Sequence, residues 1–361
     1  MTEKNDTKQL IDRLEATRNL SRDEWIRLIQ NRTADDADYL FERAQAVRTR
    51  HYGRSVYIRG LIEFTNYCKN DCFYCGIRKS NRNANRYRLT KEQILSCCEM
   101  GYALGFRTFV LQGGEDGSFT DDRLTDIISS IRTRWRACAI TLSVGERSYE
   151  SYKRLYDAGA NRFLLRHETY DDTHYGKLHP PALSAARRKQ CLFDLKKIGY
   201  QVGTGFMVGS PYQTSENLAD DMLFLKELNP QMVGIGPFIP HHDTPFADQK
   251  AGSADLTLFL LGLIRLLLPK VLLPATTALG TIDSDGREKG ILAGANVIMP
   301  NLSPPQVREK YLLYDNKLCT GDEAAESLRS LKQRIQNIGY EITVSRGDSL
   351  NLSLIHISEP T

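Results

Sequence analysis

The chain has 361 residues, of which 48 are basic and 44 acidic, so its formal net charge is only +4. Hydrophobic residues make up 41% and charged residues 25%, which excludes a disordered chain, a collagen-like repeat and a coiled coil. Basic and acidic residues are interspersed, so the sequence has no basic stripe that would bind nucleic acid. The most apolar stretch, 256–279, is too short to span a membrane, because it is interrupted by Arg265, Pro269, Lys270 and Pro274.

The first 50 residues predict an amphipathic helical extension. Ser21 stands three residues before Glu24, which is the pattern of a capping box, and 34–47 carries apolar residues at helical spacing. The first ten residues contain no apolar segment typical of a secretion signal, so we expect a cytoplasmic protein. We expect this extension at 1–50, a main domain at 51–345 and a disordered or foreign tail at 346–361.

From residue 56 onward, short β-rich runs alternate with amphipathic segments of helical length. The predicted strands are 57–64, 108–111, 139–144, 162–166, 201–208, 232–236, 271–275 and 296–299. The predicted helices are 91–104, 121–135, 149–158, 183–198, 215–228 and 254–268. Eight strands with helical crossovers predict an α/β fold, a TIM-type (βα)8 barrel. An open doubly wound sheet is the alternative, but no GxGxxG turn follows the first strand.

In such a barrel the chemistry lies at the carboxyl ends of the strands. Almost all the predicted strand ends are polar, glycine or proline: Thr65, Asn66, Gly113, Gly114, Glu115, Ser143, His167, Glu168, Met207, Gly209, Pro237, Thr276, Thr277 and Pro300. The pair Gly113-Gly114 either forms a simple turn or lets the backbone approach a ligand closely.

Three of the eight cysteines, Cys68, Cys72 and Cys75, follow the first strand with the spacing C-x3-C-x2-C. A structural zinc ion takes four protein ligands, and no fourth cysteine or histidine lies in this loop. An iron-sulfur cluster can be held by three cysteines, which leaves one iron open. The triplet therefore predicts a 4Fe-4S cluster, with zinc as the alternative, and Tyr74 would cover one face of the cofactor.

The other five cysteines are expected to be small buried hydrophobic residues. They are Cys97, Cys98, Cys138, Cys191 and Cys319.

This spacing, with an aromatic residue before the last cysteine, resembles the signature of radical S-adenosylmethionine (SAM) enzymes, and Gly113-Gly114-Glu115 resembles their GGE element. The resemblance implies that the open iron chelates SAM, that an electron from the reduced cluster cleaves it, and that a 5'-deoxyadenosyl radical results. It also implies that the GGE backbone holds the amino group of SAM and that Ser143 is among the cofactor-binding residues.

From about residue 57 to 319 the chain is similar to the HydE family of iron-iron hydrogenase maturases, in the subgroup that also contains biotin synthase and methylornithine synthase. LLRHET at 164–169, GFMVGSP at 205–211, GIGPFIPHHDTP at 234–245 and GANVIMPNLSP at 294–304 carry this resemblance. It implies that Glu168 binds the ribose of SAM and Arg187 its carboxylate. It also implies a cavity for a small anionic, sulfur-bearing substrate, lined by Arg162, Arg166, Thr276, Thr277, Met299, Tyr311 and Tyr314.

The residues themselves leave alternatives to these roles. Arg162 and Arg166 point to the same side of a strand because their spacing is even, and such donors suit a planar anion. Arg166 could equally pair with Glu168 on the same face.

Two further pairs have an ordinary explanation. Tyr311 and Tyr314 would face one way on a helix, which core packing explains at least as often as substrate binding. His241 and His242 could be ligands, but they are expected to take part in loop packing.

The resemblance implies an enzyme whose radical attacks sulfur of an iron-bound cysteine complex during assembly of the di-iron subcluster. The radical enzyme HydG, the scaffold GTPase HydF and a ferredoxin or flavodoxin would be its partners. One alternative is a radical attack on carbon, as in biotin or methylornithine synthase. A second is a non-catalytic iron-sulfur or zinc protein, which the polar strand ends disfavour.

Two features depart from the family pattern. Of the three cysteines that hold a second cluster in some members, only Cys319 remains, so no second cluster is expected. The end of the chain from Asn351 does not resemble the family's terminus, and we expect it to be foreign.

Overall fold

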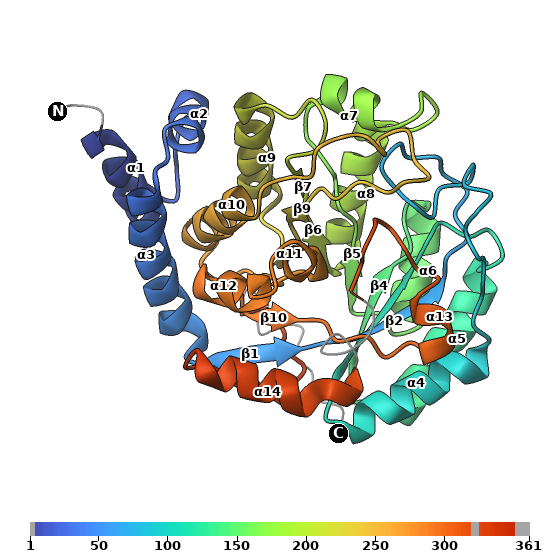
Figure 1. Cartoon of the computed structure of the whole chain (residues 1–361). Helices are drawn as coiled ribbons and strands as arrows, with labels where there is room; N and C mark the ends of the chain where they lie inside the picture. Colours follow the sequence, from blue (N-terminus) through green and yellow to red (C-terminus); the bar gives the residue numbers. More distant parts are fainter. Residues whose placement is uncertain (1–3, 319–324, 351–361) are drawn as a thin grey trace.

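The computed structural model describes residues 4–318 and 325–350 (Figure 1). The chain begins with three helices, α1 (Lys4–Thr17), α2 (Arg22–Gln30) and α3 (Ala34–Tyr52). Ser21 caps α2 in the predicted capping box with Glu24. The three helices lie along one side of the barrel, where α2 packs against α9 and α3 against α10.

The core is a closed ring of parallel strands. Six strands pair in the order β2 (Gly60–Thr65), β3 (Thr108–Gly113), β4 (Ala139–Ser143), β5 (Arg162–Leu164), β6 (Gln201–Thr204) and β8 (Met232–Val233). Single bridges complete the ring: Met232 to Leu272, Pro274 to Val297 of β10 (Val297–Ile298), and Asn301 back to Leu61. The segment around Leu272 and β10 thus serve as seventh and eighth strands, and the predicted (βα)8 barrel is confirmed.

Three predicted strands are each divided in the structure, and the sixth, 232–236, separates into β8 and β9 (Gly236–Pro237). The first becomes β1 (Ser55–Ile58) and β2, and β1 pairs with β10 and with β11 (Glu341–Thr343). The fifth becomes β6 and β7 (Met207–Val208), and β7 pairs with β9. The break in the fifth strand lies at Gly205, where a Cβ would stand 2.0 Å from the carbonyl oxygen of Gly234. The close approach of two backbones therefore interrupts a pattern that reads as one strand.

The predicted helices are present within two residues of their expected bounds. They are α4 (Lys91–Ala103), α5 (Asp121–Arg134), α6 (Tyr149–Asp157), α8 (Ala185–Ile198), α9 (Ser215–Leu228) and α10 (Ala254–Leu267). Shorter helices that were not predicted are α7 (Asp172–Leu178), α11 (Thr277–Ile282), α12 (Gly286–Leu292), α13 (Pro305–Arg308) and α14 (Leu328–Asn337). Among the helices of the described residues, none combines the length and apolar character needed to cross a membrane.

The amino ends of the strands are closed by residues 346–350, which were expected to be disordered. Arg162, at the start of β5, is fully buried and donates through Nη2 to Asp348 Oδ1 at 2.7 Å and to the Arg346 carbonyl at 2.7 Å. Gln201 donates to the same Asp348 oxygen at 2.8 Å. Residues 346–350, which belong to the expected disordered or foreign tail, thus make defined contacts with the barrel, and residues 351–361 lie outside the described part.

We expect Asp348→Ala to lower the free energy of unfolding by about 2 to 3 kcal/mol, because it leaves Arg162 buried without a counter-charge. Burial by itself would raise the pKa of Asp348, but the ion pair with Arg162 lowers it to about 2. The folded value lies below the unfolded value of about 3.9, so the stabilisation is present above about pH 4 and is lost as the pH falls toward 2. Denaturant unfolding at several pH values measures it. Asp248→Ala, at an exposed position, is the control. Equal losses of unfolding free energy in Asp248→Ala and Asp348→Ala would contradict the stabilising role of the Arg162–Asp348 pair.

Candidate functional site

The three clustered cysteines lie on the loop that follows β2. All three line one cavity of about 340 Å³ at the carboxyl ends of the strands. The loop is pinned by Arg86, whose guanidinium donates to the carbonyl oxygens of Asn66, Ile77, Arg78 and Asn81. A loop without regular structure is thereby held in one shape, since four of its carbonyls are satisfied by one cation.

Gly113 and Gly114 let the cysteine loop approach the end of β3. A Cβ on Gly114 would stand 2.3 Å from the Tyr67 carbonyl oxygen and 2.8 Å from Cys68 Cβ. The Lys69 amide donates to the Glu115 carbonyl at 2.9 Å, which ties the loop to this turn. The glycine pair thus allows a close approach of two segments of the chain, whereas its approach to a ligand stays a prediction.

The thiols suit a metal cluster better than a single zinc ion. Burial raises the pKa of Cys72 to about 12 and raises that of Cys75 further, so their thiolates need the positive charge of metal ions. His179 also lines the cavity, but Tyr74 Oη lies 3.1 Å from its Nε2 and its Nδ1 lies 3.0 Å from the Tyr175 carbonyl oxygen. Both of its nitrogens are therefore occupied, so His179 is not a free fourth ligand.

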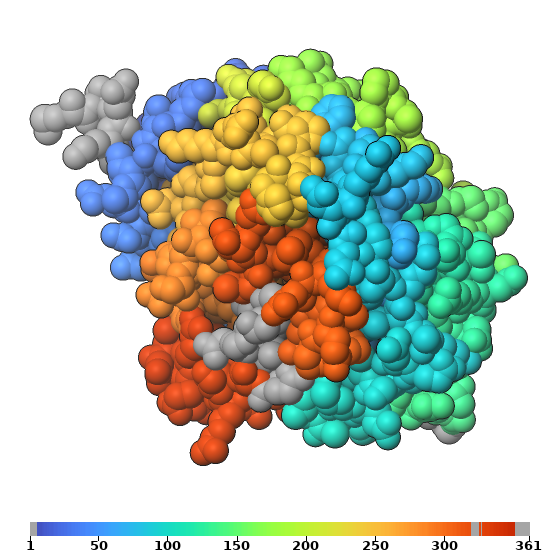
Figure 2. Space-filling model, turned by 45° about the vertical axis from the view of Figure 1, so that its right-hand side comes forward, coloured from blue at the N-terminus to red at the C-terminus, as the bar shows by residue number. Residues whose placement is uncertain are grey.

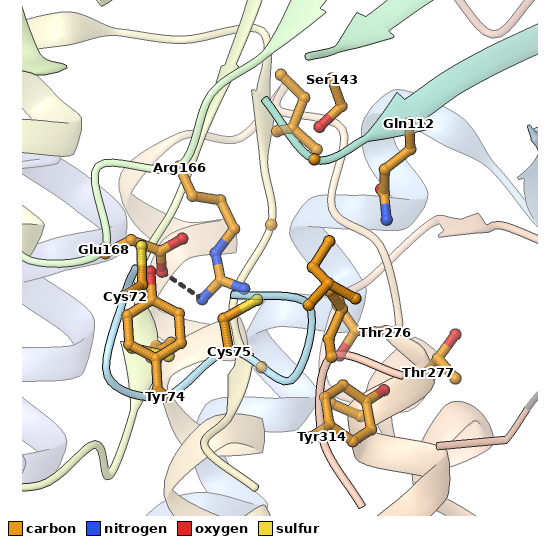
Figure 3. A pocket seen from close by; sticks show the side chains of 18 of the residues that line it. Cys72, Tyr74, Cys75, Gln112, Ser143, Arg166, Glu168, Thr276, Thr277 and Tyr314 are labelled. Carbon is orange, nitrogen blue, oxygen red and sulfur yellow. Dashed lines mark ion pairs between the residues drawn. The ribbon is translucent and has the colours of Figure 1, made fainter. Parts of the chain in front are cut away.

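Glu168 stands at the end of β5 with a left-handed backbone, φ +68°. Its amide donates to the Gly205 carbonyl at 3.1 Å, and its Oε2 lies 3.2 Å from Nη2 of Arg166 (Figure 3). The alternative pairing of Arg166 with Glu168 is thus present. The Nε of Arg166 is buried and has no hydrogen-bond partner among the described residues, so this cation keeps a free donor near the cavity.

The structure brings Arg188, and not Arg187, to the cavity. Arg188 lines it, with its side chain 15% exposed, and donates to the Arg166 carbonyl at 2.6 Å and to Glu146 Oε1 at 3.0 Å. The side chain of Arg187 is 47% exposed and donates to the Arg147 carbonyl outside the cavity. Adjacent residues of α8 lie about 100° apart around the helix axis, so a shift of one position moves the side chain to another face.

Arg162 is not a cavity residue, and its expected role in substrate binding is corrected here. It lies at the amino end of β5, bonded to Asp348, whereas Arg166 lies past the carboxyl end of the same strand. Four residues of extended chain separate them by about 13 Å. Even spacing places two side chains on one face of a strand but does not place them at one end.

His167 points away from the cavity, into the core behind Glu168. Its Nδ1 lies 2.8 Å from Thr204 Oγ1 and its Nε2 lies 3.2 Å from Asp221 Oδ1. Burial lowers the pKa of His167 to about 3, so the ring is neutral and its single N–H serves the network behind the site.

The remaining predicted residues also line the cavity. Ser143, Thr276, Thr277, Met299, Tyr311 and Tyr314 all line it, as do Tyr74, Gly113, Gly114 and Glu115. Figure 3 shows Thr276, Thr277 and Tyr314 across from Arg166 and Glu168. The Thr276 hydroxyl is buried without a hydrogen-bond partner in the described part of the chain, so a polar group of a ligand would find a partner there.

Sequence reasoning missed six polar residues of the wall: Glu63, Asn70, Gln112, His179, Arg188 and Lys317. A signal existed for Glu63, because a carboxylate inside an otherwise apolar strand is unusual in a core. No local signal exists for Lys317, which reaches the cavity from a segment without regular structure.

His241, His242 and Asp315 lie together, and one ligand atom of each lies within 4.8 Å of the others, an arrangement that could hold a metal ion. Loop packing and a ligand role of the two histidines both stay predictions. His241 Nδ1 accepts the Asp243 amide at 3.1 Å, and His242 Nδ1 lies 2.6 Å from Asp315 Oδ1. Four of the five dispersed cysteines, Cys97, Cys98, Cys138 and Cys191, are buried thiols, whereas Cys319 and the question of a second cluster lie outside the described residues.

Comparisons with known proteins agree with this site. The model of the Radical SAM superfamily matches residues 62–225. The chain is 45% identical over 300 residues to the FeFe hydrogenase maturase subunit HydE of Thermotoga maritima, an alignment that covers 83% of this chain and 85% of that protein. The chain belongs to the HydE family of radical SAM enzymes. Membership of this family confirms the predicted 4Fe-4S cluster and SAM as cofactors, and the zinc alternative is set aside.

More distant relatives share the fold with the HydE family. The chain is 29% identical to 3-methylornithine synthase of Methanosarcina acetivorans over 89% of this chain and 90% of that one. The crystal structure of methylornithine synthase (PylB) superposes with a TM-score of 0.82 at 27% identity and covers 92% of this chain and 97% of that one. The hydrogenase maturase HydG superposes with a TM-score of 0.79 at 20% identity, which shows a common barrel.

We expect Gly114→Ala to prevent stable cluster assembly, because the new Cβ would displace the Tyr67 carbonyl and Cys68. After anaerobic reconstitution, iron should fall from about four atoms per chain toward one or none. Gly117→Ala in the same turn is the control, since nothing lies within 4 Å of its Cβ position. Full iron content in Gly114→Ala would show that the loop does not depend on this approach.

Proposed function

We propose that this protein cleaves SAM reductively and directs the 5'-deoxyadenosyl radical to a small anionic, sulfur-bearing substrate during FeFe hydrogenase maturation. The observation that carries the proposal is that three thiols, two arginines and a row of polar groups line one cavity. The 45% identical HydE protein supports the place in maturation. HydG, HydF and a ferredoxin or flavodoxin as electron donor belong to this proposal as its partners.

A 4Fe-4S cluster held by Cys68, Cys72 and Cys75 would supply the electron that cleaves SAM. The chain's own residues orient the rest of the cofactor. Arg188 takes the role first expected of Arg187, because its guanidinium is the one that lines the cavity beside Glu115, at 3.9 Å. Glu168, whose carboxylate lies beside Arg166 at the cavity, holds the ribose. Ser143 and Tyr74 border the same volume.

The substrate lies deeper, between Arg166 and the two threonines. Arg166 lies beside Glu168, and its Nε and Nη2 have no hydrogen-bond partner among the described residues, so both are donors for an anionic group. Thr276 follows the segment that serves as the seventh strand, and its hydroxyl group lies at the same cavity. Charged and hydroxyl donors that converge from two walls fix the position of a small anion, which is what a radical transfer over a short distance requires.

A methylornithine synthase-like attack on carbon is the second candidate, favoured by the TM-score of 0.82 with that enzyme. A biotin synthase-like donation of sulfur is less well supported, because Cys138 precedes β4 at the amino end of the barrel and does not line the cavity. Assays with L-lysine and with dethiobiotin test these two activities directly.

Two measurements test the proposed function. The reconstituted, reduced wild type should release 5'-deoxyadenosine and methionine, and Cys72→Ala should lose both products together with its iron, since a cluster with two protein ligands is not retained. The wild type should also restore hydrogenase activity to an extract that contains every maturase except this one. Stoichiometric zinc in the wild type and in Cys72→Ala would contradict the proposed reductive cleavage of SAM. Cleavage of SAM without restored hydrogenase activity would contradict the proposed role in maturation.

Arg188→Ala should weaken SAM binding by about 1 to 3 kcal/mol, the usual cost of removing a charged hydrogen-bond partner. Its neighbour supplies the control, because Arg187→Ala removes the same side chain one position earlier and should bind SAM like the wild type. Titration calorimetry on the reconstituted proteins measures both. If Arg187→Ala bound SAM more weakly than Arg188→Ala, the SAM-binding role would belong to Arg187, as first expected.

A further inference from the structure

Two histidines and an aspartate lie together beside the cavity of the cysteines but do not line it. His241 and His242 belong to the loop that follows β9, and Asp315 belongs to the segment that follows α13. Figure 2 shows that the loop around residue 240 and the segment around residue 310 meet at the surface beside the cysteine-loop region. The three side chains thus join two parts of the chain that are far apart in the sequence.

The rings of the two histidines converge on one carboxylate oxygen. Nδ1 of His242 lies 2.6 Å, and Nδ1 of His241 4.0 Å, from the same atom, Oδ1 of Asp315. The rings are stacked, with centroids 4.4 Å apart and planes inclined by 21°. Ligand atoms at about 2.1 Å from one tetrahedral ion lie about 3.4 Å from one another. The two distances lie on either side of this value, so small side-chain movements would make the three atoms ligands of one ion.

The protonation of the rings suits a metal ion. Nδ1 of His241 accepts the Asp243 amide at 3.1 Å, so this nitrogen carries no proton, and a metal ion would replace the amide as its partner. Burial lowers the pKa of His241, so its ring is neutral at pH 7, as a ligand must be. The hydrogen bond with Asp315 raises the pKa of His242, and an ion bound between these two residues would displace the proton that they share.

The surroundings favour a cation and give it access. Nε2 of His242 lies 3.3 Å from Oδ2 of Asp243, so carboxylates flank this ring on both of its nitrogens. Both histidines border a second cavity of about 160 Å³. The side chain of His242 is 66% exposed and that of Asp315 32%, whereas His241 is buried. An ion can therefore enter from the solvent and keep water as its remaining ligands.

We propose that His241, His242 and Asp315 bind one divalent transition-metal ion, separate from the iron-sulfur cluster. Two imidazole nitrogens and one carboxylate suit Zn²⁺, Fe²⁺ and Co²⁺, whereas Mg²⁺ and Ca²⁺ take oxygen ligands. The site goes beyond the proposed function and does not depend on it, because none of its three residues meets the cysteines, SAM or the substrate.

Such an ion fastens the segment that covers the cavity. Asp315 follows Tyr314, which lines the cavity. The Asp315 amide donates to the Pro240 carbonyl at 3.0 Å, and the Gly76 amide of the cysteine loop donates to the Leu313 carbonyl at 2.9 Å. A metal ion between Asp315 and the two histidines would add bonds to the first of these contacts, so the segment would open less often.

Equilibrium dialysis against cobalt chloride tests the site in the reconstituted holoenzyme, without reductant and after EDTA has removed loosely bound iron. Cobalt takes the same ligands as zinc and can be measured beside the iron of the cluster. The wild type should bind about one cobalt ion per chain and keep its iron. His242→Ala and Asp315→Asn should each weaken cobalt binding by about tenfold or more, since loss of even an outer partner of a ligand costs this much.

Matched variants control for unspecific binding. His51→Ala, on α3, and Asp248→Asn, at an exposed position, make the same chemical changes elsewhere and should bind cobalt like the wild type. His242 is largely exposed, so His242→Ala decides if Asp315→Asn does not fold. No bound cobalt in the wild type, or equal binding by the site variants and the controls, overturns the proposal.

Hydrogen exchange tests the fastening of the covering segment. Cobalt should slow the exchange of amides in residues 309–317 of the wild type by about threefold or more, because exchange there needs local opening, and should leave Asp315→Asn unchanged. A wild type that binds cobalt at these three residues without slower exchange keeps the metal site and overturns its fastening role.

Discussion

The closure of the barrel between its first and eighth strands is the contact on which the rest of the molecule depends. The Leu61 amide donates to the Pro300 carbonyl at 2.9 Å, and the Leu302 amide donates to the Leu61 carbonyl at 2.7 Å. Gly60 makes this possible, since a Cβ there would stand 2.1 Å from Leu302 Cδ1. Because β2 is joined on this side, the cysteine loop at its end meets the segment that follows the eighth strand. One cavity then receives its cluster ligands from residues near 70 and its far wall from residues near 315.

Charge compensation governs the inside of that cavity. Arg166 lies beside Glu168, Arg188 beside Glu146, and Lys317 beside Glu63. Isolated charges in a place with little water would be costly, so each cation is kept next to a carboxylate. Each cation keeps N–H groups that its carboxylate does not accept. The carboxylate holds the cation in place and so sets the direction of these N–H groups. A cavity of this kind holds a charged ligand in one orientation without a large excess of either charge.

The two ends of the barrel have different roles. At the amino ends of the strands, Arg162, Asp348 and Gln201 form a network of buried hydrogen bonds that supports stability. At the carboxyl ends, polar groups such as the Thr276 hydroxyl and Arg166 Nε remain without partners in the described part of the chain. This division is typical of TIM-type barrels, in which the amino ends stabilise the fold and the carboxyl ends carry the chemistry.

The sequence by itself determined the (βα)8 fold and the cysteine triplet with its cofactor, because strand and helix periodicity and ligand spacing are local properties of the chain. It also indicated most of the cavity wall, since residues at the carboxyl ends of parallel strands necessarily meet. Only the tertiary structure decided that Arg188 faces the cavity instead of Arg187, that Arg162 belongs to the opposite end, and that Lys317 reaches Glu63. Those outcomes depend on the rotation of a helix, on position along a strand, and on a contact between residues 254 positions apart, none of which leaves a local pattern.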